Sequence, residues 1–338
     1  MGKIFSLILL VLSFTACSGN GGNSEKVHNN RNVVIPVRDS IKEINTGDVL
    51  IGSVSRLFVS DKYLLIVDSK SYDKLIHIFE KDEYKHICSV GQLGQGPYEI
   101  TSIGSLAIDD ARNKFYVSDH GKMKIFSYDM DSLQHNPESY KHNEKVKIKD
   151  AMFPSSYYFI NDTLSYARVI MPTSVSTFEQ GIGKWNMNTG KMEIMPYTHP
   201  AIKNKRSVFD VSVKHNFYVE AYLRHDLLSI CDLNGNLKCN VYGPDWNGGD
   251  KSRISCYGDV FITKENIMAT YSGGDYNDSY YPTQILVFDL SGNYIQTLDV
   301  GYKISDCCYD EKNDRMIMVF DDDIQFGYLD LKNLIMKN

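Results

Sequence analysis

The chain has 338 residues, long enough for one large domain or two small ones. It carries 36 Lys and Arg residues against 42 Asp and Glu residues, a net charge of −6, and has no block of Lys or Arg. Nucleic-acid binders show a basic face, so this balance argues against a nucleic-acid partner. With 43% hydrophobic and 23% charged residues the composition is that of a globular protein, and disorder is excluded. The 23 Tyr and 15 Phe residues favour β-structure, because aromatic side chains suit pleated sheets.

The first residues have the pattern of a secretory signal. Lys3 precedes the apolar run Ile4 to Leu12, and small residues follow it. The run is too short to span a bilayer, which takes roughly 20 apolar residues. The pair Ala16-Cys17 resembles a bacterial lipobox, so we expect residues 1–16 to be a signal peptide and Cys17 to carry a lipid. A plain secretory signal that ends near a cysteine is the alternative.

A Gly- and Asn-rich stretch follows Cys17 and has nothing to bury. We expect residues 17–44 to form a lipidated flexible tether with a possible closing strand, and residues 18 to about 30 to be disordered. The only membrane contact expected is through the lipid. The expected location is therefore the cell envelope.

Six further cysteines remain, and none has the C-x-x-C spacing of a zinc or thioredoxin-like site. Cys231 and Cys239 flank a hairpin sequence. A three-residue loop at Asn234 to Asn236 would place the two thiols opposite each other and allow a disulfide. A two-residue loop would not, and two buried thiols are the alternative.

One pattern recurs six times: an apolar or aromatic strand, an acid or Asn, and then turn residues. The six units end their marker strands at Glu80, Asp129, Asn186, Asp232, Asp289 and Asp330. These positions span 250 residues, a mean period of 50. No helical period of 3.6 is sustained, which excludes helical solenoids. Repeats of this length with several short strands are typical of β-propellers.

We therefore predict an all-β fold: a six-bladed β-propeller over residues 45–338, with four-stranded antiparallel blades and no second domain. Two β-sandwiches with coincidental spacing are the alternative. The glycine-rich segment 91–100 lacks the Gly-Lys-Ser/Thr of a P-loop and no helix follows it. It is interpreted as a crossover between the first two blades.

The sequence GQGPYEI at 94–100, followed by LAIDDARNKFYVSDHGKMKIFSYD at 106–129, resembles the NHL-type propeller blade. It is more similar still to the TolB-like six-bladed β-propeller lipoproteins of Bacteroidetes. This resemblance implies the fold and an envelope location, and it implies no established activity. It also implies O-glycosylation at Asp-Ser/Thr-apolar triplets, which here contain Ser40, Ser132 and Thr163. The stretch after Cys17 lacks the acidic cluster of surface-exported relatives, which favours the periplasmic face over surface exposure.

No motif assigns catalytic residues: H-E-x-x-H, G-x-S-x-G and EF-hand spacing are all missing from the sequence. Two functions remain, a binding module and an enzyme, and the binding module is favoured. The chain is a cell-envelope binding or scaffold module for a protein, peptide or glycan, or it is a calcium-dependent hydrolase of the lactonase type with the metal in the propeller channel. The candidate metal ligands are Asp68, Asp119, Glu220 and Asp321, which follow similar strands in four units.

A propeller is a ring, and its first and last blades must be joined or they present open edges. Two apolar stretches upstream of the first unit, 33–37 and 41–44, are not needed by that unit. We expect one of them to pair in the last blade, beside 324–329 or 334–336. Pro36 restricts the first stretch to an edge position, so 41–44 is the first choice.

Overall fold

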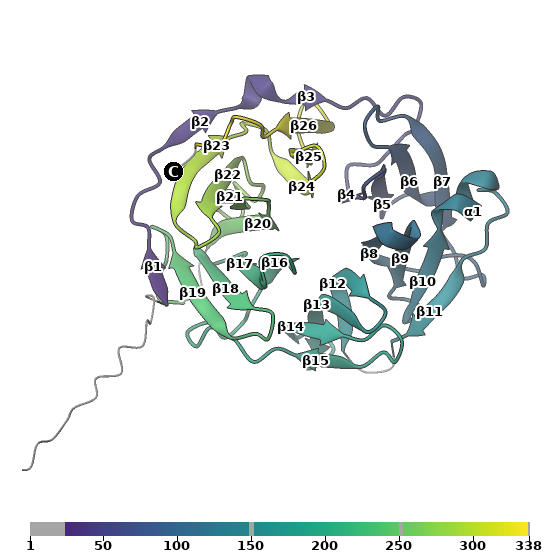
Figure 1. The fold of residues 1–338 in the computed structure, drawn as a ribbon, viewed down its shortest axis with the longest axis horizontal. Helices are drawn as coiled ribbons and strands as arrows, with labels where there is room; N and C mark the ends of the chain where they lie inside the picture. The colour runs from purple at the N-terminus through teal and green to yellow at the C-terminus, as the bar shows by residue number, and fades with distance from the viewer. Residues whose placement is uncertain (1–23, 149–151, 250–252, 337–338) are drawn as a thin grey trace, which may run out of the picture.

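Six β-sheets stand around a central axis in the computed structural model, which describes residues 24–148, 152–249 and 253–336 (Figure 1). Each sheet is one blade. Strands that follow one another in the chain pair antiparallel within a blade, from the innermost strand at the axis outward, and three N-terminal strands are added at the rim. This confirms the six-bladed all-β fold.

The first three blades each contain four strands. Blade 1 is β4 (Ser55–Val59), β5 (Tyr63–Asp68), β6 (Lys74–Glu80) and β7 (His86–Gln92); blade 2 is β8 (Ile103–Asp109), β9 (Lys114–Asp119), β10 (Lys124–Asp129) and β11 (Asn143–Lys147); blade 3 is β12 (Phe153–Asn161), β13 (Leu164–Pro172), β14 (Phe178–Trp185) and β15 (Met192–Ile194). The short helices η2 (Asp110–Arg112) and α1 (Met130–His135) lie in blade 2. The glycine-rich segment connects β7 to β8, as predicted.

The last three blades receive strands from the N-terminal segment. Blade 4 is β16 (Ser207–Ser212), β17 (Phe217–Tyr222), β18 (Leu227–Asp232) and β19 (Leu237–Tyr242); blade 5 is β20 (Ile254–Ile262), β21 (Asn266–Asp275), β22 (Gln284–Asp289) and β23 (Tyr294–Asp299); blade 6 is β24 (Ile304–Asp310), β25 (Arg315–Phe320) and β26 (Phe326–Asp330). The third strands of the six blades are the six marker strands of the sequence repeat.

The acid that ends a marker strand organises the turn after it. Asp232 accepts backbone N–H groups of Asn234 and Asn236, at 2.8 and 2.9 Å, and Asp289 does the same in blade 5. Gly235 in the first turn has φ +84°, a conformation that side chains with a Cβ rarely adopt. The repeat was visible in the sequence because these turns need particular residues.

The hydrophobic core is divided among the seams between neighbouring blades. Successive side chains of a strand point to opposite faces, so each second strand packs against two neighbours. In β9, Phe115 and Val117 pack with Leu65 of blade 1, whereas Tyr116 packs with Tyr157 of blade 3. This is why second strands such as β5, β9, β17 and β25 are buried on both faces rather than on alternate residues.

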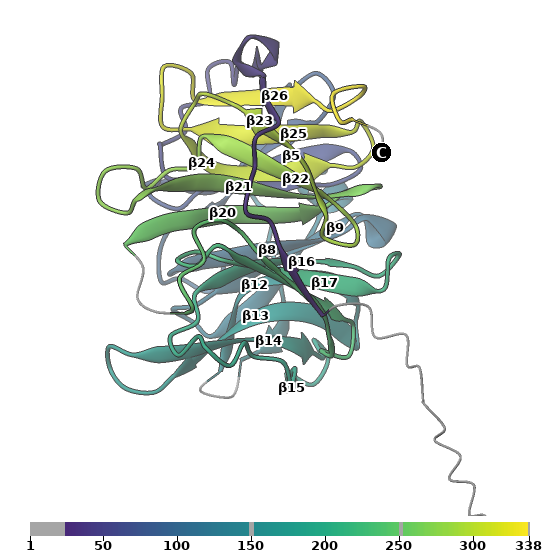
Figure 2. The same ribbon diagram turned by 90° about the vertical axis from the view of Figure 1, so that its left-hand side faces the viewer.

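The N-terminal segment runs along the rim of blades 4, 5 and 6 as three short strands (Figures 1 and 2). β1 (Glu25–Val27) pairs parallel with β19, β2 (Val34–Pro36) pairs parallel with β23, and β3 (Lys42–Glu43) pairs antiparallel with β26. We call residues 25–43 the N-terminal strap. β3 confirms that 41–44 supplies the fourth strand of blade 6, and β2 is an edge strand.

The strap corrects one prediction. Residues 24 to 30 were expected to be disordered, yet β1 bonds to the open edge of β19. The rim of blade 4 offers unpaired backbone groups, and these hold a segment that has no apolar pattern of its own. The predicted signal peptide and Cys17 lie outside the described residues.

Of the two alternatives for Cys231 and Cys239, the structure has two buried thiols and not the disulfide. A register shift in the hairpin pairs Cys239 with Ile230 and Cys231 with Leu237. Cys239 therefore shares a face with Ile230 and packs against blade 5, while Cys231 faces blade 3. The two thiols lie on opposite sides of the sheet, and both are free and buried.

Candidate functional site

A cavity of about 600 Å³ follows the central axis. It is lined by the innermost strands of all six blades, β4, β8, β12, β16, β20 and β24. Ligand sites in proteins commonly have volumes of about 300–1,000 Å³. The channel is therefore large enough to hold a small molecule or a short peptide.

The four acids predicted from the sequence as metal ligands do not line this cavity. Asp68 and Asp119 end the second strands of blades 1 and 2 and accept backbone N–H groups of the loops that lead into their blades. For Asp119 the donors are Thr101 and Ser102, at 2.9 and 3.0 Å. Both acids thus fix loops.

Glu220 and Asp321 occupy different positions from that pair. The first residues of the three second strands are equivalent, because each pairs with the acid that ends the third strand of its blade. These first residues are Tyr63 in β5, Phe217 in β17 and Arg315 in β25. By this count Glu220 lies two positions earlier than Asp68, and Asp321 lies one position later. Glu220 is buried and forms an ion pair with Lys205, with 2.9 Å between Nζ and Oε1, whereas Asp321 is exposed.

The structure therefore does not bring the four acids together. Across residues 24–148, 152–249 and 253–336, no three His, Cys, Asp or Glu side chains are placed to share a cation. The prediction of a calcium site at these positions is corrected accordingly, because the four acids lie in or directly after second strands, one strand removed from the channel.

The innermost strands bring other charged groups to the channel. Asp259 on β20 and Asp306 on β24 lie on adjacent blades, and Arg56 on β4 and Arg168 on β13 line the same cavity. Asp210 on β16 completes the set. All five are half-buried. Within the described part of the chain, none of the five forms an ion pair with another.

Four of these residues bind the backbone of the next blade. Arg56 donates to the carbonyl of Gly104, and Arg168 donates to Ser207 O at 3.0 Å. Asp210 accepts from Ile262 N and Asp306 accepts from Leu57 N, both at 2.6 Å. These bonds join blades 1 to 2, 3 to 4, 4 to 5 and 6 to 1.

Asp259 differs from the others because its carboxylate has no such structural bond. Its one side-chain partner among the described residues is the Cys307 thiol, with 3.8 Å from Sγ to Oδ2. A thiol is a weak donor. Asp259 is therefore a poorly satisfied carboxylate that faces a cavity.

Burial shifts the pKa values of these acids upward. The carboxyls are reachable from the channel, yet the six blades around them displace most of the surrounding water. Burial raises the pKa of Asp259 to about 6, against the attraction of Arg168, and burial also raises the pKa of Asp210 to about 6. Burial and the nearby charge of Asp259 raise the pKa of Asp306 further. Perturbed acids in a cleft are typical of functional sites.

None of these five residues was predicted from the sequence, because the marker strands of the repeat are third strands and do not locate the innermost strands. A usable signal was present: Arg56, Asp210, Asp259 and Asp306 each interrupt a short apolar strand that precedes a second strand of the repeat. In a propeller this position is next to the axis. A charge there marks the channel.

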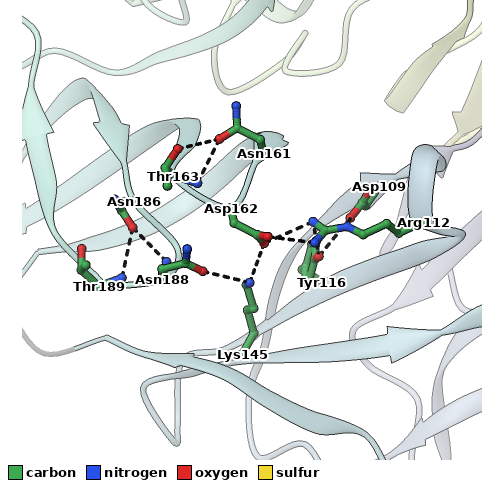
Figure 3. Close-up of polar contacts among 10 residues, drawn as sticks. All are labelled: Asp109, Arg112, Tyr116, Lys145, Asn161, Asp162, Thr163, Asn186, Asn188 and Thr189. Carbon is green, nitrogen blue, oxygen red and sulfur yellow. Dashed lines mark hydrogen bonds and ion pairs between the residues drawn. The ribbon is translucent and has the colours of Figure 1, made fainter.

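The three predicted glycosylation residues are all exposed: Ser40 in the short helix η1 (Arg38–Ser40), Ser132 in α1 and Thr163 in the β12–β13 turn. Exposure is a requirement for a sugar. Beside Thr163, Asp162 forms ion pairs with Arg112 and Lys145, which lower the pKa of its carboxyl to about 2 (Figure 3). Modification stays a prediction, which mass spectrometry of the native protein would test.

The fold and the lined channel define a closed six-bladed β-propeller. Residues 44–230 match the family model DUF5128, described as a 6-bladed beta-propeller, and the chain belongs to this family. No curated protein matches the chain. No helix within the three described ranges is both long and apolar enough to cross a membrane.

Two solved structures from Bacteroides share the fold. A candidate exported protein of Bacteroides fragilis is 12% identical, with 90% of this chain and 98% of that chain covered and a TM-score of 0.55. A member of the duf4221 family from Bacteroides vulgatus is 11% identical, with 86% and 97% covered and a TM-score of 0.56. At these identities the likeness concerns the fold alone.

Proposed function

We propose that this chain is a binding module of the cell envelope that holds its partner at the charged part of the propeller channel. The observation that carries the proposal is Asp259, a carboxylate that lines a 600 Å³ cavity and receives only a thiol from the described residues. A half-buried acid without a strong partner costs stability, and acids with perturbed pKa values in a cleft are typical of functional sites.

The rest of the channel supports a site that is formed before the partner arrives. Arg56 and Arg168 are fixed by bonds to neighbouring blades, and both keep further N–H donors. Side chains held in this way bind with little loss of conformational entropy. The partner is a protein, peptide or glycan segment that enters the channel with polar groups.

The proposal is tested with the full chain and a variant that carries Asp259→Asn and Asp306→Asn. Thermal unfolding is followed with amino acids, di- and tripeptides, monosaccharides and disaccharides as separate probes. A ligand of the channel raises the melting temperature of the native protein and leaves the variant unchanged. Asp48→Asn, an exposed acid outside the channel, is the matched control.

The channel is not the binding site if the double variant keeps every response of the native protein. The variant removes two like charges. The one backbone contact of these two carboxylates among the described residues is the bond that Asp306 accepts from Leu57 N, and the side-chain oxygen of Asn can accept it too. A folded variant is therefore expected, and its unliganded melting temperature checks this.

The envelope location and the finer likeness to TolB-like and NHL-type propellers rest on the sequence. If Cys17 carries the lipid, replacing it with Ala should move the protein from the membrane fraction to the soluble fraction of the host cell. Immunoblots of fractionated cells measure this. Unchanged membrane retention of Cys17→Ala would contradict a lipid anchor at this residue.

A further inference from the structure

We infer that the channel binds a zwitterionic ligand, with an ammonium group against Asp259 and Asp306 and a carboxylate against Arg56 and Arg168. The inference rests on the proposed function and names the chemical class of the partner. A free α-amino acid and a short peptide share this chemistry.

Acidic and basic side chains line the cavity from different blades. The acids come from blades 4, 5 and 6, and the two arginines come from blades 1 and 3. The charges are close enough to interact, since the charge of Arg168 lowers the pKa of Asp259 and that of Arg56 lowers the pKa of Asp306. They nevertheless form no ion pair with one another among the described residues. A ligand with both signs of charge fits between them.

Asp259 and Asp306 repel each other, which is one of the causes that raise the pKa of Asp306. Their unused lone pairs need donors, and Asp259 has only the Cys307 thiol. A primary ammonium carries one positive charge and three donors. It would relieve the repulsion and supply the missing hydrogen bonds.

Arg56 donates one hydrogen bond, to Gly104 O, and Arg168 donates two, to Ser155 Oγ and Ser207 O. Each guanidinium has five N–H donors. No atom of either arginine is among the buried polar atoms without a partner, so the unused donors are open to the cavity. A carboxylate matches the geometry of such donors well.

The cavity also provides an apolar surface for the remainder of the ligand. Tyr158 lines it with 36% of its surface exposed, and its ring meets Phe209 edge-on at 5.3 Å between centroids. Phe58 and Phe261 line the same space. The side chain of an amino acid or the body of a dipeptide can pack on these rings.

The test uses calorimetric titration of the full chain with L-alanine and glycylglycine at pH 7.5. N-acetylglycylglycine lacks the ammonium, glycylglycinamide lacks the carboxylate, and D-glucose lacks both. Binding by the zwitterions and a loss of at least about tenfold for each blocked peptide are expected. L-alanine against glycylglycine distinguishes a free amino acid from a peptide.

A variant makes the assignment specific to one end of the ligand. Asp259→Asn should weaken glycylglycine by about tenfold and should leave N-acetylglycylglycine unaffected, because the acetylated ligand has no ammonium to lose. Arg56→Met should likewise weaken glycylglycine, and it should leave glycylglycinamide unaffected because that ligand has no carboxylate to lose. Asp48→Asn should change nothing. Selective effects of this kind cannot arise from a general loss of folding.

The outcomes separate the two proposals. If D-glucose or a disaccharide binds in the channel as well as the zwitterions do, or if blocking either end has no effect, the inference is wrong while the binding function stands. If the double variant Asp259→Asn with Asp306→Asn binds every probe and every envelope partner as the native protein does, the inference and the proposed binding function are both wrong.

Discussion

Asp259 illustrates how a single residue opposes the stability of the fold that contains it. Its carboxyl has a pKa of about 6 in the folded chain, against roughly 3.9 for an unperturbed Asp. The folded state therefore holds the proton more tightly between about pH 4 and pH 6. The protonated carboxyl contributes its full stabilisation at low pH, and this stabilisation is lost as the pH rises through 6. The ionised form therefore costs stability at neutral pH.

Asp259→Asn should therefore stabilise the protein at pH 8 by about 1–3 kcal/mol and have little effect near pH 4. The groups that face Asp259 are Arg168, Asp306, Cys307 and Tyr158, and the loss of attraction to Arg168 sets the lower end of this range. Thermal unfolding of the variant and of Asp48→Asn at both pH values measures the effect. A variant less stable than the native protein at pH 8 would assign Asp259 a structural role instead.

The position of Asp259 also explains why the site was harder to predict than the fold. Strand β20 pairs irregularly with β21 between Ser255 and Val260, and Asp259 lies within this bulge. A bulge re-aims a side chain without changing the apolar pattern around it. Conversely, Asp68 and Glu220 looked equivalent in the sequence, but a shift of two positions along a strand separates them. Sequence periodicity locates strands well and side-chain convergence poorly.

At the scale of elements, the N-terminal strap is held by one buried ion pair. Arg31 donates to both oxygens of Asp226, at 2.7 and 3.0 Å, and the side chain of Asp226 is fully buried. The hydroxyls of Tyr257 and Tyr271 donate to the same carboxylate, at 2.9 and 3.1 Å. The strap is thereby attached between β1 and β2 by a charged contact as well as by backbone pairing.

Arg31→Met should cost about 3–5 kcal/mol, because it leaves the Asp226 carboxylate buried without its cation. Limited proteolysis should then cut within residues 24–36 faster than in the native protein. The double variant Arg31→Met with Asp226→Asn is the control, and it should recover part of the loss because no charge remains buried. Equal losses in the single and double variants would mean that shape, rather than charge, holds the strap.

The elements differed in how far the sequence could predict them. The strand β3 was expected, because an apolar stretch without a place in blade 1 matched a need in blade 6. The strand β1 was not expected, because Glu25–Val27 has no pattern and pairs parallel with an edge that exists only in the folded ring. Local sequence reveals a strand that carries its own apolar face, and it misses one that is recruited by a neighbour.

At the scale of the whole molecule, the strap makes the two halves of the ring unequal. It covers β19, β23 and β26, whereas the outermost strands of blades 1, 2 and 3 carry no further strand in the described structure. The seam between blades 6 and 1 has a second closure: Lys81 and Asp310 form an ion pair at 2.7 Å with both side chains 1% exposed. Ring closure thus depends on β3 and on this buried pair.

Deletion of residues 24–46 should lower the melting temperature by several degrees, since roughly 2–4 °C is lost per kcal/mol in a domain somewhat smaller than this one. Hydrogen exchange should rise in β19, β23 and β26, whose outer edges lose their partners, and should stay unchanged in β7, β11 and β15. Those three strands serve as the internal control within each sample. A uniform rise across all six blades would show instead that the ring opens as one cooperative unit when the strap is removed. An unchanged melting temperature would mean that the Lys81–Asp310 pair and the seams between the blades close the ring without β3.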